Sequence, residues 1–195
     1  MNEIELIEKL SKLEKPIFTL ADLQKILPVS SQSLYTTISR LTKRGVLQKI
    51  SRGVYAPFGR IVIPEEIAPL LYYPSYLSLN TALSKVGVIN QIPQEVLLVT
   101  PRKTKILKIS GTKVVYRQIQ KKLFFGWHLS KGIPVAYPEK ALLDLIYFAS
   151  RGRAYLPLRE LDLSPLDPIR WQKFASLFPK TTQRLISRVT KKLAL

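Results

Sequence analysis

One segment near the start of the chain constrains the fold most, because it changes from helical to strand periodicity at a single glycine. Leu34, Ile38 and Leu41 recur at the spacing that places them on one face of a helix. A serine at position 30 or 31 can cap the start of this helix, and Gly45 stands where it would end. The sequence therefore predicts an amphipathic helix that begins at this serine pair and ends just before the glycine.

The residues after this glycine have the pattern of a β-hairpin. Residues 46–50 and 54–56 are short runs of mainly apolar residues, as expected for strands. Ser51-Arg52-Gly53 lies between them and has the composition of a tight turn. We therefore expect a hairpin directly behind the helix.

Two further helices are predicted upstream. Apolar residues recur at helical spacing between residues 4 and 13, and the pattern stops before Pro16. Thr19 can cap a second helix, which Pro28 would end. Helices joined by a short turn and followed by a hairpin are typical of a winged helix-turn-helix, which we predict for residues 1–60.

The outer face of the third predicted helix contains no acidic residue. It mixes hydroxyl, amide and basic side chains, which can bond to base edges or phosphates. The candidate DNA-binding residues on this recognition helix are Ser31, Gln32, Ser33, Tyr35, Thr36, Ser39, Arg40, Lys43 and Arg44. Those on the hairpin, or wing, are Lys49, Ser51 and Arg52. The alternatives are a merely solvated helix face and a winged helix that binds another protein.

The charge of the chain points to a polyanionic partner. Lys and Arg number 31 against 13 Asp and Glu, which gives a formal charge of +18. Residues 23–64, 96–138 and 168–195 contain no acid but hold seven, nine and seven basic residues. A polyanion would offset the self-repulsion of such a chain, and nucleic acid is favoured over anionic membrane. The alternative is that the basic composition reflects only solubility or the genome's general composition.

For residues 61–195, the last two-thirds of the chain, the sequence predicts a larger mixed α/β domain. A linker is expected at 57–64, and the predicted fold class of the whole chain is α+β. The predicted strands are 96–100, 106–110, 113–119 and 123–127, and the predicted helices are 77–86, 138–149, 168–177 and 181–192.

Two basic clusters fall within this domain. Arg102, Lys103, Lys105 and Lys108 follow a predicted strand and are a candidate second nucleic-acid surface, with a solvated hairpin as the alternative. The last predicted helix carries Arg184, Arg188, Lys191 and Lys192 opposite an apolar side. Such a helix can lie on an anionic membrane, but its apolar side is modest and is needed by the core, so no membrane partner is expected.

Several phrases of the sequence resemble one family. They are Arg52-Gly53-Val54-Tyr55, Pro74-Ser75-Tyr76-Leu77-Ser78-Leu79, Gln91-Ile92-Pro93, and Pro138-Glu139-Lys140-Ala141-Leu142-Leu143-Asp144-Leu145. The last is the most specific. Up to about residue 150, the chain resembles the AbiEi-type antitoxins of type IV toxin–antitoxin (abortive infection) systems, which are winged-helix transcriptional regulators.

The resemblance implies an autorepressor that binds inverted repeats of double-stranded DNA in its own promoter. It also implies a functional link to a nucleotidyltransferase-type toxin, which such antitoxins neutralise without forming a stable complex. The C-terminal domain would contribute both to repression and to antitoxicity. We expect a protein that is monomeric in solution and pairs on DNA.

The sequence offers little for catalysis, and we expect neither an enzyme nor a bound cofactor or metal. There is no cysteine, and His128 is the only histidine, in a context that indicates a structural or surface role. We expect Glu139 and Asp144 to cap and charge the start of their helix. The N-terminus does not resemble a signal peptide, which predicts a cytoplasmic protein.

Three other functions stay open at this point. The chain can be an RNA-binding protein, which would shield an RNA target of a toxin. It can also be a plain winged-helix regulator without a toxin partner, or a module whose basic surface meets an acidic protein.

Overall fold

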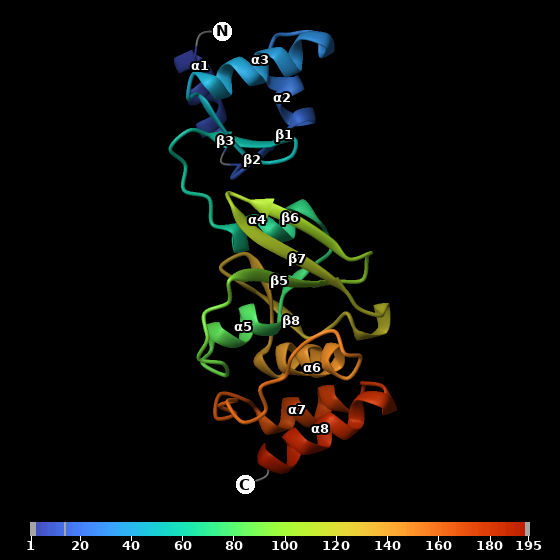
Figure 1. Ribbon diagram of the computed structural model, residues 1–195. Helices are drawn as coiled ribbons and strands as arrows, with labels where there is room; N and C mark the ends of the chain where they lie inside the picture. Colours follow the sequence, from blue (N-terminus) through green and yellow to red (C-terminus); the bar gives the residue numbers. More distant parts are fainter. Residues whose placement is uncertain (1–2, 14, 194–195) are drawn as a thin grey trace. The chain divides into compact units, whose positions relative to one another are not determined.

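The chain divides into two compact units in a computed structural model, which describes residues 3–13 and 15–193 (Figure 1). The first unit comprises Met1–Ile67 with Leu107–Thr112, and the second comprises Ala68–Ile106 with Lys113–Leu195. Both contain helices and strands, so the predicted α+β class is confirmed. No helix in the described ranges is long and apolar enough to cross a membrane.

The first unit consists of three helices and a small sheet. The helices are α1 (Glu3–Lys12), α2 (Leu20–Ile26) and α3 (Ser31–Lys43), and the strands are β1 (Phe18–Thr19), β2 (Leu47–Ser51) and β3 (Val54–Pro57), in the order β1-β3-β2. The predicted order of three helices followed by a hairpin is confirmed. Strand β1 was not predicted, because two residues are too few to show a period.

Local sequence signals set the ends of these helices. The Thr19 side chain accepts a hydrogen bond from the Asp22 amide, and the Asp22 side chain accepts one from the Thr19 amide. This reciprocal capping box begins α2, as expected from Thr19. Ser30 is the N-cap of α3, and its hydroxyl accepts from the Ser33 amide.

The glycine after α3 allows the chain to reverse. Gly45 has a φ of 71°, a left-handed conformation that side chains disfavour. The Gly45 amide bonds to the Thr42 carbonyl and the Val46 amide to the Leu41 carbonyl, which is the Schellman arrangement. The hairpin therefore follows α3 after a turn of only three residues, 44–46.

One apolar cluster holds the first unit together. Leu6 and Leu10 from α1 meet Leu23 from α2 and Leu34 and Ile38 from α3, and all five are buried. Because these positions lie on one face of each helix, the opposite faces are left exposed to solvent.

The second unit is built on a mixed sheet with strand order β6-β7-β5-β4-β9-β8. The strands are β4 (Tyr76–Leu77), β5 (Glu95–Thr100), β6 (Lys105–Ile109), β7 (Thr112–Gln118), β8 (Trp127–Ser130) and β9 (Ile133–Ala136). The helices are α4 (Pro64–Leu71), which lies at the border of the two units, α5 (Leu79–Lys85), the 3₁₀ turn η1 (Lys121–Leu123), α6 (Pro138–Ala149), α7 (Pro168–Ala175) and α8 (Lys180–Leu193). Strand β5 runs parallel to β7 and antiparallel to β4, and β4 runs parallel to β9.

Three features of the structure differ from the predicted elements. The strand predicted at 123–127 is wrong, because that stretch turns through η1 and a loop before β8 begins at Trp127. Helix α4 begins at Pro64, the last residue of the expected linker, and runs through residues for which no element was predicted. Strands β4 and β9 are held by pairing with strands distant in the sequence, such as Leu77 with Leu98 and with Val135, which no local pattern reveals.

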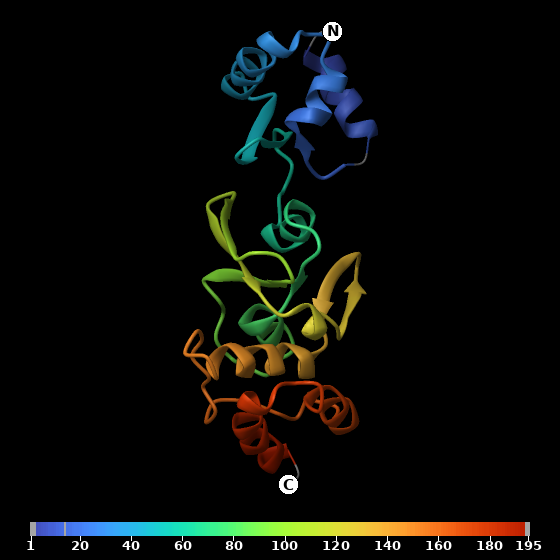
Figure 2. The same ribbon diagram turned by 90° about the vertical axis from the view of Figure 1, so that its right-hand side faces the viewer.

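Helix α6 is the centre of the second unit. In both views it lies between the sheet and the pair α7 and α8 (Figure 1 and Figure 2). Ten consecutive residues from Glu139 to Phe148 are buried, so α6 is covered on all sides. A helix in that position cannot present side chains to a large partner.

Candidate nucleic-acid interface

The outer face of α3 is exposed along its whole length. Leu34, Ile38 and Leu41 are buried against the rest of the first unit. All nine residues predicted for the recognition helix are exposed: Ser31, Gln32, Ser33, Tyr35, Thr36, Ser39, Arg40, Lys43 and, as the C-cap, Arg44. Helical geometry therefore brings these residues together on one surface that contains no acid.

The basic residues of this face are not equivalent. Within the part of the chain that the structure describes, Arg40 and Lys43 make no side-chain hydrogen bond or ion pair. The Arg44 Nε instead lies 2.9 Å from Glu3 Oε1 of α1, in an ion pair whose side chains are 61% and 35% exposed. Arg40 and Lys43 are thus available to an anion, whereas the charge of Arg44 is already paired with the Glu3 carboxylate. No sequence signal indicated Glu3, because it lies far from Arg44 along the chain.

A shallow hollow follows this face. It has a volume of about 670 Å³ and is lined by Tyr35, Thr36, Ser39, Arg40, Lys43 and Arg44. Its hydroxyl and cationic donors suit phosphate oxygens and base edges alike. The Ser33 hydroxyl lies 3.0 Å from that of the N-cap Ser30, and either hydroxyl can donate to the other.

The hairpin presents the other predicted contacts. Lys49 and Arg52 are exposed, and Ser51 is half-buried as the last residue of β2. Gly53 completes the turn with a φ of 71°. Its carbonyl accepts a hydrogen bond from the Leu20 amide at 3.2 Å, which holds the turn to the start of α2. Arg52 is therefore carried by a fixed turn.

Most of this arrangement lies in a segment that matches a known family model. Residues 5–57 match the family model described as transcriptional regulator, AbiEi antitoxin. The match confirms the resemblance seen in the sequence for this segment, which we call the AbiEi segment. It ends at Pro57, the last residue of β3, so it contains α2, α3 and the hairpin. No curated protein matches the chain.

The candidate second surface lies outside the AbiEi segment and is centred on Tyr72. The Arg102 guanidinium carbon lies 4.2 Å from the centre of the Tyr72 ring, and the Lys105 Nζ lies 4.8 Å from it. The Tyr72 hydroxyl donates to the Lys103 carbonyl at 3.0 Å, and Arg102 donates to the Tyr73 carbonyl at 2.9 Å. Arg102 is therefore committed to contacts within the protein. Lys103 and Lys108 are exposed, Lys108 on β6 in the part of that strand that belongs to the first unit.

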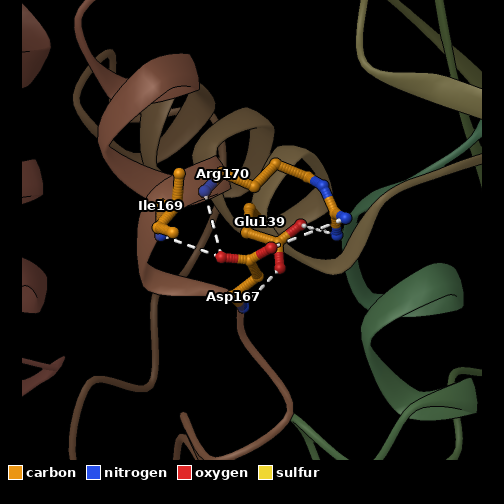
Figure 3. Close-up of polar contacts among 4 residues, drawn as sticks. All are labelled: Glu139, Asp167, Ile169 and Arg170. Carbon is orange, nitrogen blue, oxygen red and sulfur yellow. Dashed lines mark hydrogen bonds and ion pairs between the residues drawn. The ribbon is translucent and has the colours of Figure 1, made fainter.

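The motif at residues 138–145, also outside the AbiEi segment, is buried. Glu139 is fully buried in the first turn of α6, where its charge was expected, but the prediction that it caps this helix is wrong, because α6 has no side-chain capping bond. Its Oε1 accepts from the Asp167 amide at 2.7 Å, and its Oε2 lies 3.4 Å from Arg170 (Figure 3). Asp167 itself caps α7 through the Ile169 and Arg170 amides. Glu139 thus ties the start of α6 to the start of α7.

The predicted role of Asp144 is wrong. Asp144 does not charge the start of α6 but lies in its second turn, fully buried beside Lys140. The Lys140 ammonium donates to Asp144 Oδ1 and, at 2.8 Å, to the Tyr76 hydroxyl. Tyr76 and Ser78 donate to Asp144 Oδ2 at 3.0 and 2.8 Å. Ser78 precedes α5 as its N-cap, yet its hydroxyl makes no capping bond and instead donates to Asp144.

Burial dominates the electrostatics of this network. It lowers the pKa of Lys140 and raises the pKa of Asp144, because each charged form loses its hydration, while the partner's opposite charge counteracts the shift. Burial and the neighbouring Asp144 also raise the pKa of Tyr76 well above its ordinary range. The network joins α6 to β4 and is closed to solvent, so its role is to hold these two elements together.

His128 lies in β8 and is half-buried. Its ring stacks on Tyr137 with centres 4.5 Å apart, and Arg170 lies 4.5 Å from the centre of that tyrosine ring. No group of three potential metal ligands occurs among the described residues. The surroundings of His128 are aromatic and cationic, which is the environment of a packing residue.

Proposed function

We propose that the chain is a DNA-binding transcriptional autorepressor that acts in the cytoplasm as the antitoxin of a type IV toxin–antitoxin system. The observation that carries this proposal is the exposed, acid-free face of α3, on which Arg40 and Lys43 have no partner within the described residues. The same helix belongs to the segment that matches the AbiEi regulators. We further propose that the protein is not an enzyme.

In this proposal the first unit is a winged helix-turn-helix. Helix α3 enters the major groove of an inverted repeat in the chain's own promoter, with Arg40 and Lys43 facing bases or phosphates. Arg52, on the fixed turn of the hairpin, contacts the adjacent backbone. Two monomers pair on the two half-sites. The functional link is to a nucleotidyltransferase-type toxin that is neutralised without a stable complex.

The test is a gel-shift titration of the full chain on DNA from upstream of its own gene and on scrambled DNA of equal length, over a salt series. We expect tight binding to the upstream DNA alone. Arg40→Ala and Lys43→Ala should weaken it without changing thermal stability, since both side chains are exposed and have no partner in the described ranges of the chain. Lys12→Ala is the matched control, because it removes one exposed positive charge from α1. Equal binding to both DNAs by the wild type would contradict the proposal.

A further inference from the structure

Helix α8 presents a second basic surface. Thr182, Ile186 and Val189 are buried against the second unit, and the Trp171 indole of α7 donates to the Thr190 hydroxyl at 2.9 Å. These contacts determine which side of α8 faces inward. The exposed side carries Arg184, Arg188 and Lys191, which we call the α8 basic row.

The α8 basic row is electrostatically unopposed. None of its three side chains makes a hydrogen bond or ion pair with any residue that the structure describes. The last acid in the sequence is Asp167, before α7 begins. Lys192 is different, because its ammonium donates to the carbonyls of Leu158 and Leu161 at 3.3 and 3.1 Å.

The geometry of the row fits a line of phosphates. Positions 184, 188 and 191 follow one another at intervals of four and three residues, so they lie on one stripe of the helix. At 1.5 Å per residue the stripe is about 10 Å long. One DNA strand carries a phosphate about every 3.4 Å of its axis, so the row spans about three phosphates. Beside it, an open hollow of about 400 Å³ lies between α7 and α8, and Gln172 and Lys191 are among its lining residues.

We propose that the α8 basic row binds the sugar–phosphate backbone of duplex DNA without regard to sequence. A membrane is disfavoured because Ile186 and Val189, which would have to enter it, are used by the core. Single-stranded nucleic acid is disfavoured because it needs exposed rings on which bases stack. Trp171 and Phe178 of this region are buried, and Phe174 packs against the same core.

This inference rests on the proposed function only in that the chain binds duplex DNA. It assigns to the second unit a contact that adds affinity but no sequence preference. The two surfaces then predict separate effects: the α3 face sets the ratio between upstream and scrambled DNA, and the α8 basic row sets the affinity common to both.

The experiment compares the full-length wild type with the triple variant Arg184→Ala/Arg188→Ala/Lys191→Ala on both DNAs over a salt series. We expect the slope of log affinity against log salt to fall by about 2.7, which is 0.9 for each of three phosphates. At 0.15 M salt this corresponds to a loss on the order of 100-fold on both DNAs, with their ratio unchanged. The control is Lys121→Ala/Lys122→Ala/Lys131→Ala, which removes three exposed charges from the same unit.

An unchanged slope, or an equal loss in the control variant, would overturn the inference, because either means that the row makes no localised contact. A loss of binding to duplex RNA but not to DNA would also overturn it. If the wild type binds both DNAs equally, the operator proposal fails, yet the slope difference still decides whether the α8 basic row binds phosphate. Circular dichroism melting of the triple variant must match the wild type for the comparison to count.

Discussion

The two units use charged residues in opposite ways. In the first unit, α3 exposes Arg40 and Lys43 on a face with no acid, and their charges are directed at solvent. In the second unit, α6 buries Glu139, Lys140 and Asp144 completely. In the first arrangement the charged side chains remain available to a partner. In the second they bind one another and neighbouring groups inside the protein. Whether charged residues can bind a partner therefore depends on their burial, and not on their type or on how specific their sequence motif is.

The largest effect is expected from a substitution that breaks the buried ion pair of the second unit. Lys140→Met leaves Asp144 buried without its cation, so we expect the second unit to lose about 3–5 kcal/mol of unfolding free energy. Both tryptophans of the chain, Trp127 and Trp171, lie in the second unit, so urea unfolding followed by tryptophan fluorescence reports on it. The double variant Lys140→Met/Asp144→Asn is the control and should recover most of the loss, because it removes the charge but keeps an oxygen that accepts from Tyr76 and Ser78. A loss in the double variant as large as in the single one would show that the ion pair is not the cause.

The second prediction sharpens the exposed side, by comparing two arginines of one helix. Arg40 has no partner in the described chain, whereas Arg44 is paired with Glu3. Arg40→Ala should cost about 1–3 kcal/mol of binding to upstream DNA, the value of one good base contact. Arg44→Ala should cost less, since its charge is already partly offset. Fluorescence anisotropy titrations measure both, and equal losses would show that the Glu3 contact has no influence on DNA binding.

A pH titration distinguishes the units further. The Lys15 ammonium, together with hydrogen bonds from Thr19, lowers the pKa of Asp22 from 3.8 to about 2. Because the folded pKa is depressed, this stabilisation is present above pH 4 and is lost as the pH falls toward 2. We expect a loss of about 1 kcal/mol, since the pair is partly exposed to solvent. Unfolding followed by far-UV circular dichroism should show this loss of stability in the wild type and not in Asp22→Asn. Unfolding of the second unit, followed by tryptophan fluorescence, is the internal control.

The smallest expected effect concerns Glu3. Glu3→Gln removes the carboxylate that lies 2.9 Å from Arg44 Nε, which leaves Arg44 free for a phosphate. Exposed ion pairs are worth about 1 kcal/mol or less, so DNA affinity should rise by no more than about fivefold. The effect should vanish in the Arg44→Ala background. If Glu3→Gln raises affinity there as well, the gain comes from net charge alone.

Local sequence signals predicted the first unit well. Thr19 and Gly45 placed helix ends through hydrogen bonds that involve only neighbouring residues. The period of Leu34, Ile38 and Leu41 identified the buried face of α3, and therefore the exposed one. In the second unit the helix at 138–149 was predicted correctly, because Pro138 at its first turn and a long apolar run are both local features.

The remainder depended on distant pairs. Strand β4 exists because it pairs with β5 and β9, and no period is visible in two residues. Asp144 was assigned to the helix start from its sequence position, but Tyr76 and Ser78, more than sixty residues away, determine its role. Glu3 and Arg44 likewise meet only after α1 packs against α3.

The sequence by itself determined the acid-free face of α3, the hairpin behind it and the segregation of basic residues, because helical period, caps and charge are properties of neighbouring residues. Only the tertiary structure decided which charges stay available. It buried Glu139, Lys140 and Asp144 and committed Arg102 and Arg44 to internal partners. It left Arg40, Lys43 and the α8 basic row without a partner among the residues that the structure describes. The physical reason is that the free energy of a charge depends on its solvent and its neighbours in space, and packing alone sets both.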